Sequence, residues 1–133
     1  MTNSVRVLLV DAANVIGSRP TGWWRDRAGA AGAFVATIRA AVVAGRVTPP
    51  VVVVLEGKAR AAAPEGLVDG VSVLHAEASG DDLLVDVARK ASIASDPRAV
   101  TLVTADRGLR RRVEGSGADV VGPSWLLSLL DPP

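Results

Sequence analysis

Acidic residues stand where apolar, strand-like runs of this chain end or where the next helix begins. Each such run is followed by its acids: Asp11 after residues 5–10, Glu56 after 51–55, Asp81 and Asp82 after 71–74, and Asp106 after 100–103. In an open parallel sheet, ligands bind in the crevice outside the carboxyl ends of the strands. Carboxylates gathered at that edge would form a cation site, and hard oxygen ligands favour Mg²⁺ or Mn²⁺.

Each acid also has an ordinary structural explanation. Asp81 and Asp82 fall in the first turn of a predicted helix, where the helix dipole favours anions, and Asp106 stands where a cap is expected. The set is harder to explain in this way. If the strands are neighbours, Asp11, Asp82 and Asp106 converge, and two carboxylates ~5 Å apart repel by about 3 kcal/mol at an effective dielectric of ~20. This repulsion exceeds the stabilisation that a helix dipole gives a carboxylate. The cluster therefore predicts either a bound cation or raised pKa values.

Two polar residues accompany the first and last acids. Asn14 follows Asp11 by three positions. It either bonds to backbone, as Asn commonly does in turns, or holds a phosphate or the Asp11 carboxylate. Thr104 precedes Asp106 by two positions and either caps the helix or orients a substrate phosphate, capping being favoured. Glu56 is placed at the rim, where it would orient water rather than bind metal directly.

Aromatic and cationic side chains follow the first acidic loop, at Trp23, Trp24, Arg25 and Arg27. Bases stacked on aromatic rings and phosphates bound by Arg are how single-stranded nucleic acid is commonly held. The alternative is that one Trp packs into the core; we expect one buried and one exposed. In the arginine-rich segment after Asp106, Arg107 adjoins the predicted metal ligand and is assigned to substrate.

Composition narrows the classes of protein. With 133 residues the chain is most simply one domain, residues 1–133, that buries an aliphatic core, since it has one Phe, three Trp and no Tyr. The net charge of +1 excludes a general basic field, so nucleic acid would be bound by local patches. The absence of cysteine excludes disulfides, zinc–thiolate sites and thiol nucleophiles. No signal peptide or membrane span is predicted, which leaves a cytoplasmic location as the default.

The elements that must position the acids alternate between strand and helix. Strands are predicted at residues 5–10, 51–55, 71–74, 100–103 and 119–121. Helices are predicted at 24–45, 58–63, from 79 until Asp96–Pro97, and at 106–114 and 123–130, with a loop from about 11 to 22. This alternation favours an α/β fold whose central parallel sheet is covered on both faces. A P-loop, a dinucleotide fingerprint and a serine nucleophile elbow are absent from the sequence.

The motifs together resemble the NYN branch of PIN-like ribonucleases, which includes YacP-like proteins. The residues that carry the resemblance are Asp11 with Asn14, Glu56-Gly57, Gly80-Asp81-Asp82 and Thr104-Ala105-Asp106-Arg107. They span nearly the whole chain, in the right order. The sequence departs from the family at Ala12-Ala13, where Gly-Tyr is common, and at Glu56, where Asp is frequent.

This resemblance implies a PIN-like, three-layer α/β/α sandwich and hydrolysis of RNA phosphodiesters with Mg²⁺ or Mn²⁺. It assigns the metal to Asp11, Asp82 and Asp106, with Asp81 competing for the place of Asp82, and it makes Asn14 the Asn of the first motif. Glu56 would assist catalysis, and Asn14, Thr104, Arg107, Trp24 and Arg25 would contact RNA. The alternative is a non-catalytic RNA-binding or scaffold module on the same fold. A homo-oligomer or a larger protein partner also remains open.

Overall fold

The computed structural model describes residues 6–94 and 100–131, which form helices around a central sheet. The strands of the sheet are β1 (Val7–Asp11), β2 (Val51–Leu55), β3 (Gly66–Val68), β4 (Val71–His75), β5 (Val100–Val103) and β6 (Asp119–Val121). Their order across the sheet is β3-β4-β2-β1-β5-β6. All neighbours are parallel except β3, which pairs with β4 in the antiparallel sense at one edge.

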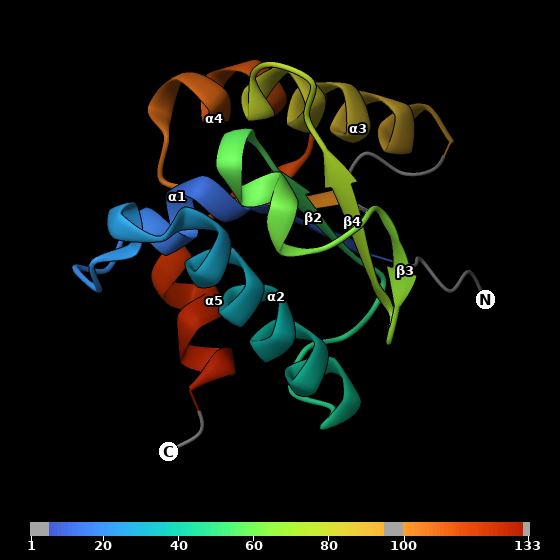
Figure 1. Cartoon of the computed structure of the whole chain (residues 1–133). Helices are drawn as coiled ribbons and strands as arrows, with labels where there is room; N and C mark the ends of the chain where they lie inside the picture. Colours follow the sequence, from blue (N-terminus) through green and yellow to red (C-terminus); the bar gives the residue numbers. More distant parts are fainter. Residues whose placement is uncertain (1–5, 95–99, 132–133) are drawn as a thin grey trace.

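Helices cover both faces of the sheet (Figure 1). They are α1 (Ala12–Gly17), α2 (Arg27–Val43), α3 (Gly80–Ala94), α4 (Arg107–Glu114) and α5 (Pro123–Leu130), with two 3-10 segments, η1 (Trp23–Arg25) and η2 (Gly57–Ala62). Residues of α1, α2 and α5 pack in one core cluster, and residues of α3 and α4 pack in the other. The predicted three-layer α/β/α sandwich is therefore confirmed.

The central strands are buried on both faces, which explains why they read as continuous apolar runs. In β1, Leu8 and Val10 face the layer of α1, α2 and α5, whereas Leu9 faces α3 and α4. Side chains of successive strand residues point to opposite faces of the sheet, so Asp11 points to the same face as Leu9. It ends the strand as a buried residue with 7% of its surface exposed.

The structure corrects the predicted elements in three places. The predicted loop at 11–22 begins with α1, which Asp11 caps through the backbone N–H of Asn14. The predicted helix at 24–45 is divided, because Asp26 ends η1 and caps α2 by accepting from the Gly29 N–H at 2.9 Å. The strand β3 was not predicted. The helix end expected at Asp96–Pro97 lies outside the described residues.

The helices also bear on the question of a membrane. Among residues 6–94 and 100–131, none of the helices has the length and apolar character needed to cross a bilayer.

Candidate active site

The carboxyl ends of β1 and β5 meet at the point where the sheet order reverses. From β1 the chain continues to β2 on one side, whereas β5 and β6 lie on the other side of β1. Such switch points are where ligands bind in open α/β sheets. Here the two strand ends are joined directly, since the Thr104 hydroxyl donates to Asp11 Oδ2 at 2.9 Å.

Asp11 is the most deeply buried acid of the site. Its second oxygen, Oδ1, accepts the backbone N–H of Asn14 at 3.3 Å. The pKa of Asp11 is raised from 3.8 to about 6, mainly by burial and in addition by the negative charges of Asp81 and Glu56, against the opposing effect of the two hydrogen bonds. Burial and two nearby acids both disfavour the charged form of the Asp11 carboxyl group, and its two hydrogen bonds offset only part of this.

Asn14 and Thr104 are both engaged inside the protein. Asn14 Oδ1 accepts the backbone N–H of Ala105 at 2.7 Å, so its side chain bonds to backbone, one of the two roles expected for it. Thr104 is only 3% exposed, and its hydroxyl oxygen also accepts the backbone N–H of Asp106 at 3.1 Å. The Thr104 hydroxyl is therefore engaged on both sides, by the Asp11 carboxylate and by the backbone at the start of α4. These bonds tie the start of α1 to the start of α4.

Two further acids cap helices at the same edge. Asp106 caps α4 by accepting the Leu109 N–H at 3.0 Å. Glu56 follows β2 and reaches across to α3, where its Oε2 accepts the Gly80 N–H at 2.8 Å. A side chain at position 80 would crowd Glu56, because an added Cβ would lie 3.1 Å from the carboxylate. Gly80 therefore permits the close approach that holds Glu56 at the edge.

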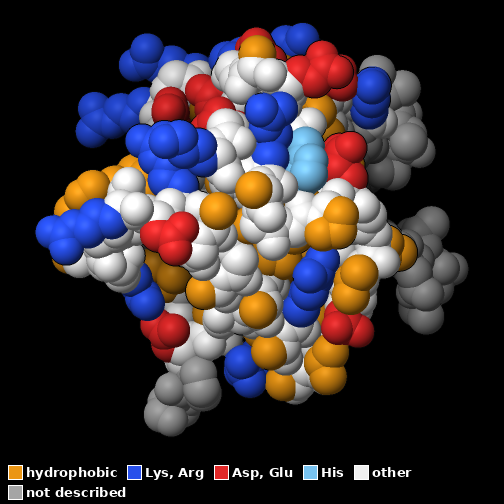
Figure 2. Space-filling view, viewed as in Figure 1, with side chains coloured by type: hydrophobic (Ala, Val, Ile, Leu, Met, Phe, Trp, Pro, Cys, Tyr) orange, Lys and Arg blue, Asp and Glu red, His pale blue; other side chains and the backbone are white. Residues whose placement is uncertain are grey.

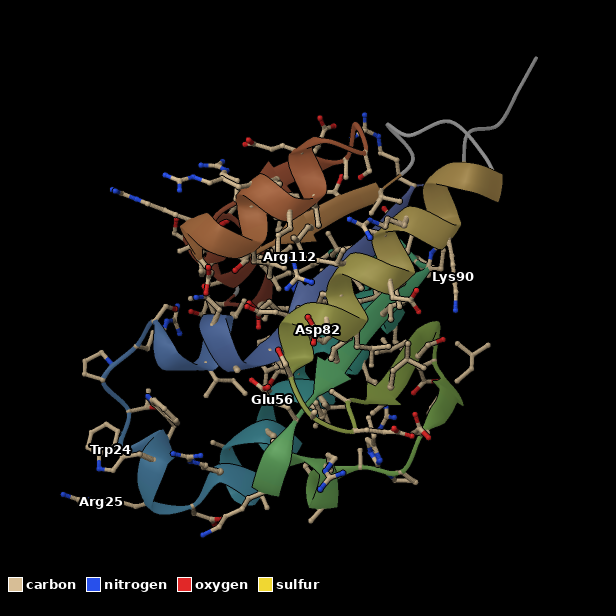
Figure 3. All side chains as sticks on the ribbon, turned by 90° about the horizontal axis from the view of Figure 1, so that it is seen from above. Trp24, Arg25, Glu56, Asp82, Lys90 and Arg112 are labelled. Atoms are coloured by element: carbon tan, nitrogen blue, oxygen red, sulfur yellow. The ribbon has the colours of Figure 1, made fainter. Side chains whose placement is uncertain are left out.

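Asp81, rather than Asp82, faces these acids. The pKa of Asp81 is raised first by burial and then by the charges of Asp106 and Glu56. Asp82 is exposed and forms an ion pair with Arg112 of α4 at 2.8 Å (Figure 3). Consecutive residues of an α-helix point about 100° apart, so the two side chains take different directions. In this structure Asp82 pairs with Arg112, whereas the acid of α3 that faces Asp106 and Glu56 is Asp81.

The acids interact electrostatically, but their side chains do not meet at one point. Within the described part of the chain, no three His, Cys, Asp or Glu side chains stand close enough to hold a metal ion. The predicted convergence is therefore only partial. Its physical reason is visible in the contacts, because Asp106 and Glu56 each accept a helix N–H and Asp82 is held by Arg112.

An aromatic and cationic surface lies beside the acidic edge. Trp24 is 52% exposed and Trp23 is half-buried, with their rings 6.0 Å apart in a T-shaped arrangement. Arg25 lies over the Trp24 ring at 5.9 Å, and both side chains project outward (Figure 3). A small cavity of about 70 Å³ is lined by Trp23 and Glu56, and so connects this surface with the acids.

Basic side chains surround the edge on the outside. Figure 2 shows Lys and Arg side chains on the side of the molecule where α4 and α1 lie, with acidic side chains among them. Arg107, expected to contact substrate, is exposed in the first turn of α4. A larger cavity, of about 640 Å³, opens at the amino ends of the strands and is lined by Arg6, Thr101 and Asp119, which lie at or just before the starts of their strands. Because the candidate acids Asp11, Glu56, Asp81 and Asp106 lie at the carboxyl edge, the larger cavity is not the candidate site.

Arg112 and Gly80 belong to this edge and were not assigned to it from the sequence. Arg112 pairs with Asp82 of α3, and which helix it would face could not be foreseen from the sequence. Gly80 carried a local signal, since a glycine at a helix start beside two acids suggests close approach of another group.

No family model matches the sequence, and no curated protein matches it. Among solved structures, the chain matches the crystal structure of a mutant form of Rae1 (YacP) from Bacillus subtilis with a TM-score of 0.66. The match covers 93% of this chain and 73% of that of Rae1, at 21% sequence identity.

This chain has the fold of Rae1. The resemblance to YacP-like proteins, first seen in the motifs around the acids, is thus confirmed at the level of the fold. At 21% identity the match with Rae1 shows the fold alone. The chemistry must therefore be argued from the acids themselves.

Proposed function

We propose that this protein is a divalent-metal-dependent endoribonuclease that hydrolyses RNA phosphodiester bonds at the carboxyl edge of its sheet. The observation that carries the proposal is the buried Asp11 carboxylate at the switch point, whose pKa is raised by burial and by Asp81 and Glu56. Perturbed carboxylates at such a position are typical of functional sites. The fold shared with Rae1 and the family resemblance of the motifs support the same reading.

The donor set fits a hard divalent cation in its chemistry. Asp11, Asp81 and Asp106 would hold Mg²⁺ or Mn²⁺, and Glu56 would stand beside them. When bound, such an ion acidifies water and offsets negative charge on the phosphate. Burial raises the pKa values of Asp11 and Asp81, and nearby negative charge raises them further; a bound cation would neutralise that charge.

The polar residues behind the acids would serve to position them. Thr104 donates to Asp11 and accepts the N–H of Asp106, so one hydroxyl sets the spacing of two proposed ligands. Asn14 fixes the backbone at Ala105. We therefore assign Asn14 and Thr104 to the support of the site, in place of the direct RNA contacts that the sequence suggested.

RNA would be bound by the surfaces on either side of the acids. Trp24 offers an exposed ring on which a base can stack, and Arg25 adds a cation beside that ring. Arg107 is exposed at the start of α4 and can contact a phosphate. Single-stranded RNA fits this surface because its bases are free to stack.

A nuclease assay with matched variants tests the proposal. Labelled single-stranded and hairpin RNAs are incubated with wild-type protein in Mg²⁺, Mn²⁺ or EDTA, beside variants purified in the same way. We expect cleavage with a divalent cation, and a loss of about a hundredfold or more in Asp11→Asn and Asp81→Asn. Asp82→Asn should still cleave. Equal activity of Asp11→Asn and wild type would refute the proposal and indicate a contaminating nuclease.

A non-catalytic RNA-binding module is the second candidate. It is favoured by one observation, that the acids of the described residues do not form a closed metal-binding group. Calorimetric titration with Mn²⁺ separates the two functions. The nuclease requires uptake of the ion that Asp11→Asn weakens, whereas a binding module would bind RNA without it.

A further inference from the structure

Arg112 connects the acidic edge with the helix beside it. It lies on α4 next to the buried Val113, and its Nη2 donates to Asp82 Oδ1 at 2.8 Å across the gap to α3. Asp82 lies in the first turn of α3, and its neighbour Asp81 faces the other acids. The positive charge of Arg112 lowers the pKa of Asp81 against the acids that raise it. Arg112 thus stands over the edge from the side opposite Glu56 (Figure 3).

The ion pair that holds Arg112 is exposed and easily exchanged. The side chain of Arg112 is 46% exposed and that of Asp82 is 71% exposed. Ion pairs in such surroundings contribute little to stability, because water solvates both partners nearly as well. The contact with Asp82 uses one nitrogen of a guanidinium group that has five N–H donors. Arg112 can therefore change partners at small cost.

A phosphate is the partner that suits Arg112 best. A guanidinium group binds phosphate oxygens with two parallel hydrogen bonds, which a single contact with an exposed carboxylate does not match. An RNA phosphate that approaches Asp11, Asp81 and Asp106 is repelled by them. The positive charge of Arg112 acts on Asp81 and would offset part of this repulsion.

We propose that Arg112 binds the RNA phosphate backbone at this site and that Asp82 competes for it. In the free protein Asp82 holds Arg112 in place beside the acids; in the complex Arg112 leaves Asp82 for the phosphate. Asp82 then restrains substrate binding although it is not a ligand of the site. The inference rests on the proposed ribonuclease function, since it needs RNA to bind at this edge.

The competition predicts opposite effects of the two partners, which is the basis of the test. Kd for a labelled 12-nucleotide single-stranded RNA is measured by fluorescence anisotropy with Ca²⁺, and KM and kcat are measured with Mn²⁺. Arg112→Ala should raise Kd and KM five- to twentyfold, and Arg112→Lys should recover only part of this. Asp82→Asn should lower both constants two- to fivefold, with kcat within twofold of wild type. In the double variant the gain from Asp82→Asn should vanish.

Matched controls come from the same two helices. Asp86→Asn removes an exposed carboxylate from α3 that pairs with Lys90 at 3.0 Å, and Arg110→Ala removes an exposed arginine of α4 that pairs with Glu114 at 3.4 Å. Each should change KM by less than half as much as the corresponding variant at Asp82 or Arg112. Thermal melting of every variant checks that it is folded.

The outcomes separate the inference from the proposed function. If Arg112→Ala and Asp82→Asn both lower the melting temperature and leave KM unchanged, the ion pair only joins two helices and the inference is wrong. If both raise KM, Asp82 supports binding and the competition is refuted. If the wild type neither binds nor cleaves RNA, the proposed function itself fails.

Discussion

At the scale of single residues, Asp11 occupies a position that lowers the stability of the fold. It is 7% exposed, and burial together with the charges of Asp81 and Glu56 raises its pKa to about 6. The Thr104 hydroxyl and the Asn14 N–H offset only part of this. A carboxylate kept in such surroundings is typical of sites whose function opposes stability.

The raised pKa of Asp11 predicts how stability depends on pH without divalent cations. The folded protein holds the Asp11 proton more tightly than the unfolded chain does, so the stabilisation is complete below pH 3.8 and is lost as pH rises through about 6. The loss amounts to about 3 kcal/mol. Asp11→Asn should abolish this dependence and should raise the free energy of unfolding at pH 7 by about 1–3 kcal/mol. Urea denaturation between pH 4 and 7 measures both effects.

A control for the Asp11 prediction is available at the start of α2. Asp26 is an exposed cap whose carboxylate accepts the Gly29 N–H at 2.9 Å. Asp26→Asn should give no gain in stability at pH 7, because no burial opposes its charge. If Asp11→Asn is instead less stable than wild type at pH 7, the burial of a charged Asp11 is well compensated and the prediction is wrong.

The sequence indicated which residue types lie at the carboxyl edge of the sheet. It indicated less well where their side chains point. Acids that end strands must lie at the carboxyl edge of a parallel sheet, so Asp11 and Glu56 could be placed from periodicity. The choice between Asp81 and Asp82 depends on the rotation of α3 about its axis, which is set by packing of Leu84, Val85 and Ala88 against the sheet. Contacts such as that of Thr104 with Asp11, 93 positions apart, have no local signature.

At the scale of elements, the start of α3 is held by a side chain from another strand. Glu56 follows β2 and accepts the N–H of Gly80, which is the first residue of α3. An N-cap acceptor is worth about 1 kcal/mol. Because the cap comes from 24 positions away, it also sets where α3, and with it Asp81, lies relative to β2.

Substitutions at Glu56 and Gly80 test this connection. Glu56→Ala should lower the free energy of unfolding by about 1 kcal/mol, because the α3 N–H loses its acceptor. Glu56→Gln should be neutral or slightly stabilising, since its amide oxygen still accepts the bond and the repulsion with Asp11 and Asp81 is removed. Gly80→Ala should resemble Glu56→Ala, because its Cβ would lie 3.1 Å from the Glu56 carboxylate. Equal stability of Glu56→Ala and Glu56→Gln would contradict the role of the cap.

Elements with a continuous apolar run or a clear cap were predictable, and those that depend on tertiary contacts were not. β2, β5, β6 and α5 have the predicted bounds. β2 and β5 are buried on both faces and so read as nearly continuous apolar runs, and Pro123 begins α5. α1 has only six residues, too few to be stable without the burial of Ala12 and Val15. β3 is an edge strand of three exposed residues, and it exists through its pairing with β4.

At the scale of the whole molecule, the two ends of the sheet differ in chemistry. The carboxyl edge carries Asp11, Asp81 and Asp106, and the exposed Trp24 lies next to it. The amino edge has the larger cavity, which is lined by Trp125, 44% exposed. The net charge of +1 provides no general attraction for RNA. RNA must therefore be bound by local groups, and these differ between the two ends of the sheet.

The two exposed tryptophans therefore provide a matched test of where RNA binds. Trp24→Ala should weaken binding of a single-stranded RNA by about 5- to 150-fold, because a stacked base contributes about 1–3 kcal/mol. Trp125→Ala removes a ring of similar exposure from the opposite edge and should leave Kd within twofold of wild type. Trp24→Phe should retain part of the affinity, since a smaller ring still stacks. Fluorescence anisotropy measures Kd for each variant, and thermal melting checks that both alanine variants fold. If Trp125→Ala weakens binding as much as Trp24→Ala, RNA does not bind selectively at the acidic edge, and the larger cavity becomes the site to study.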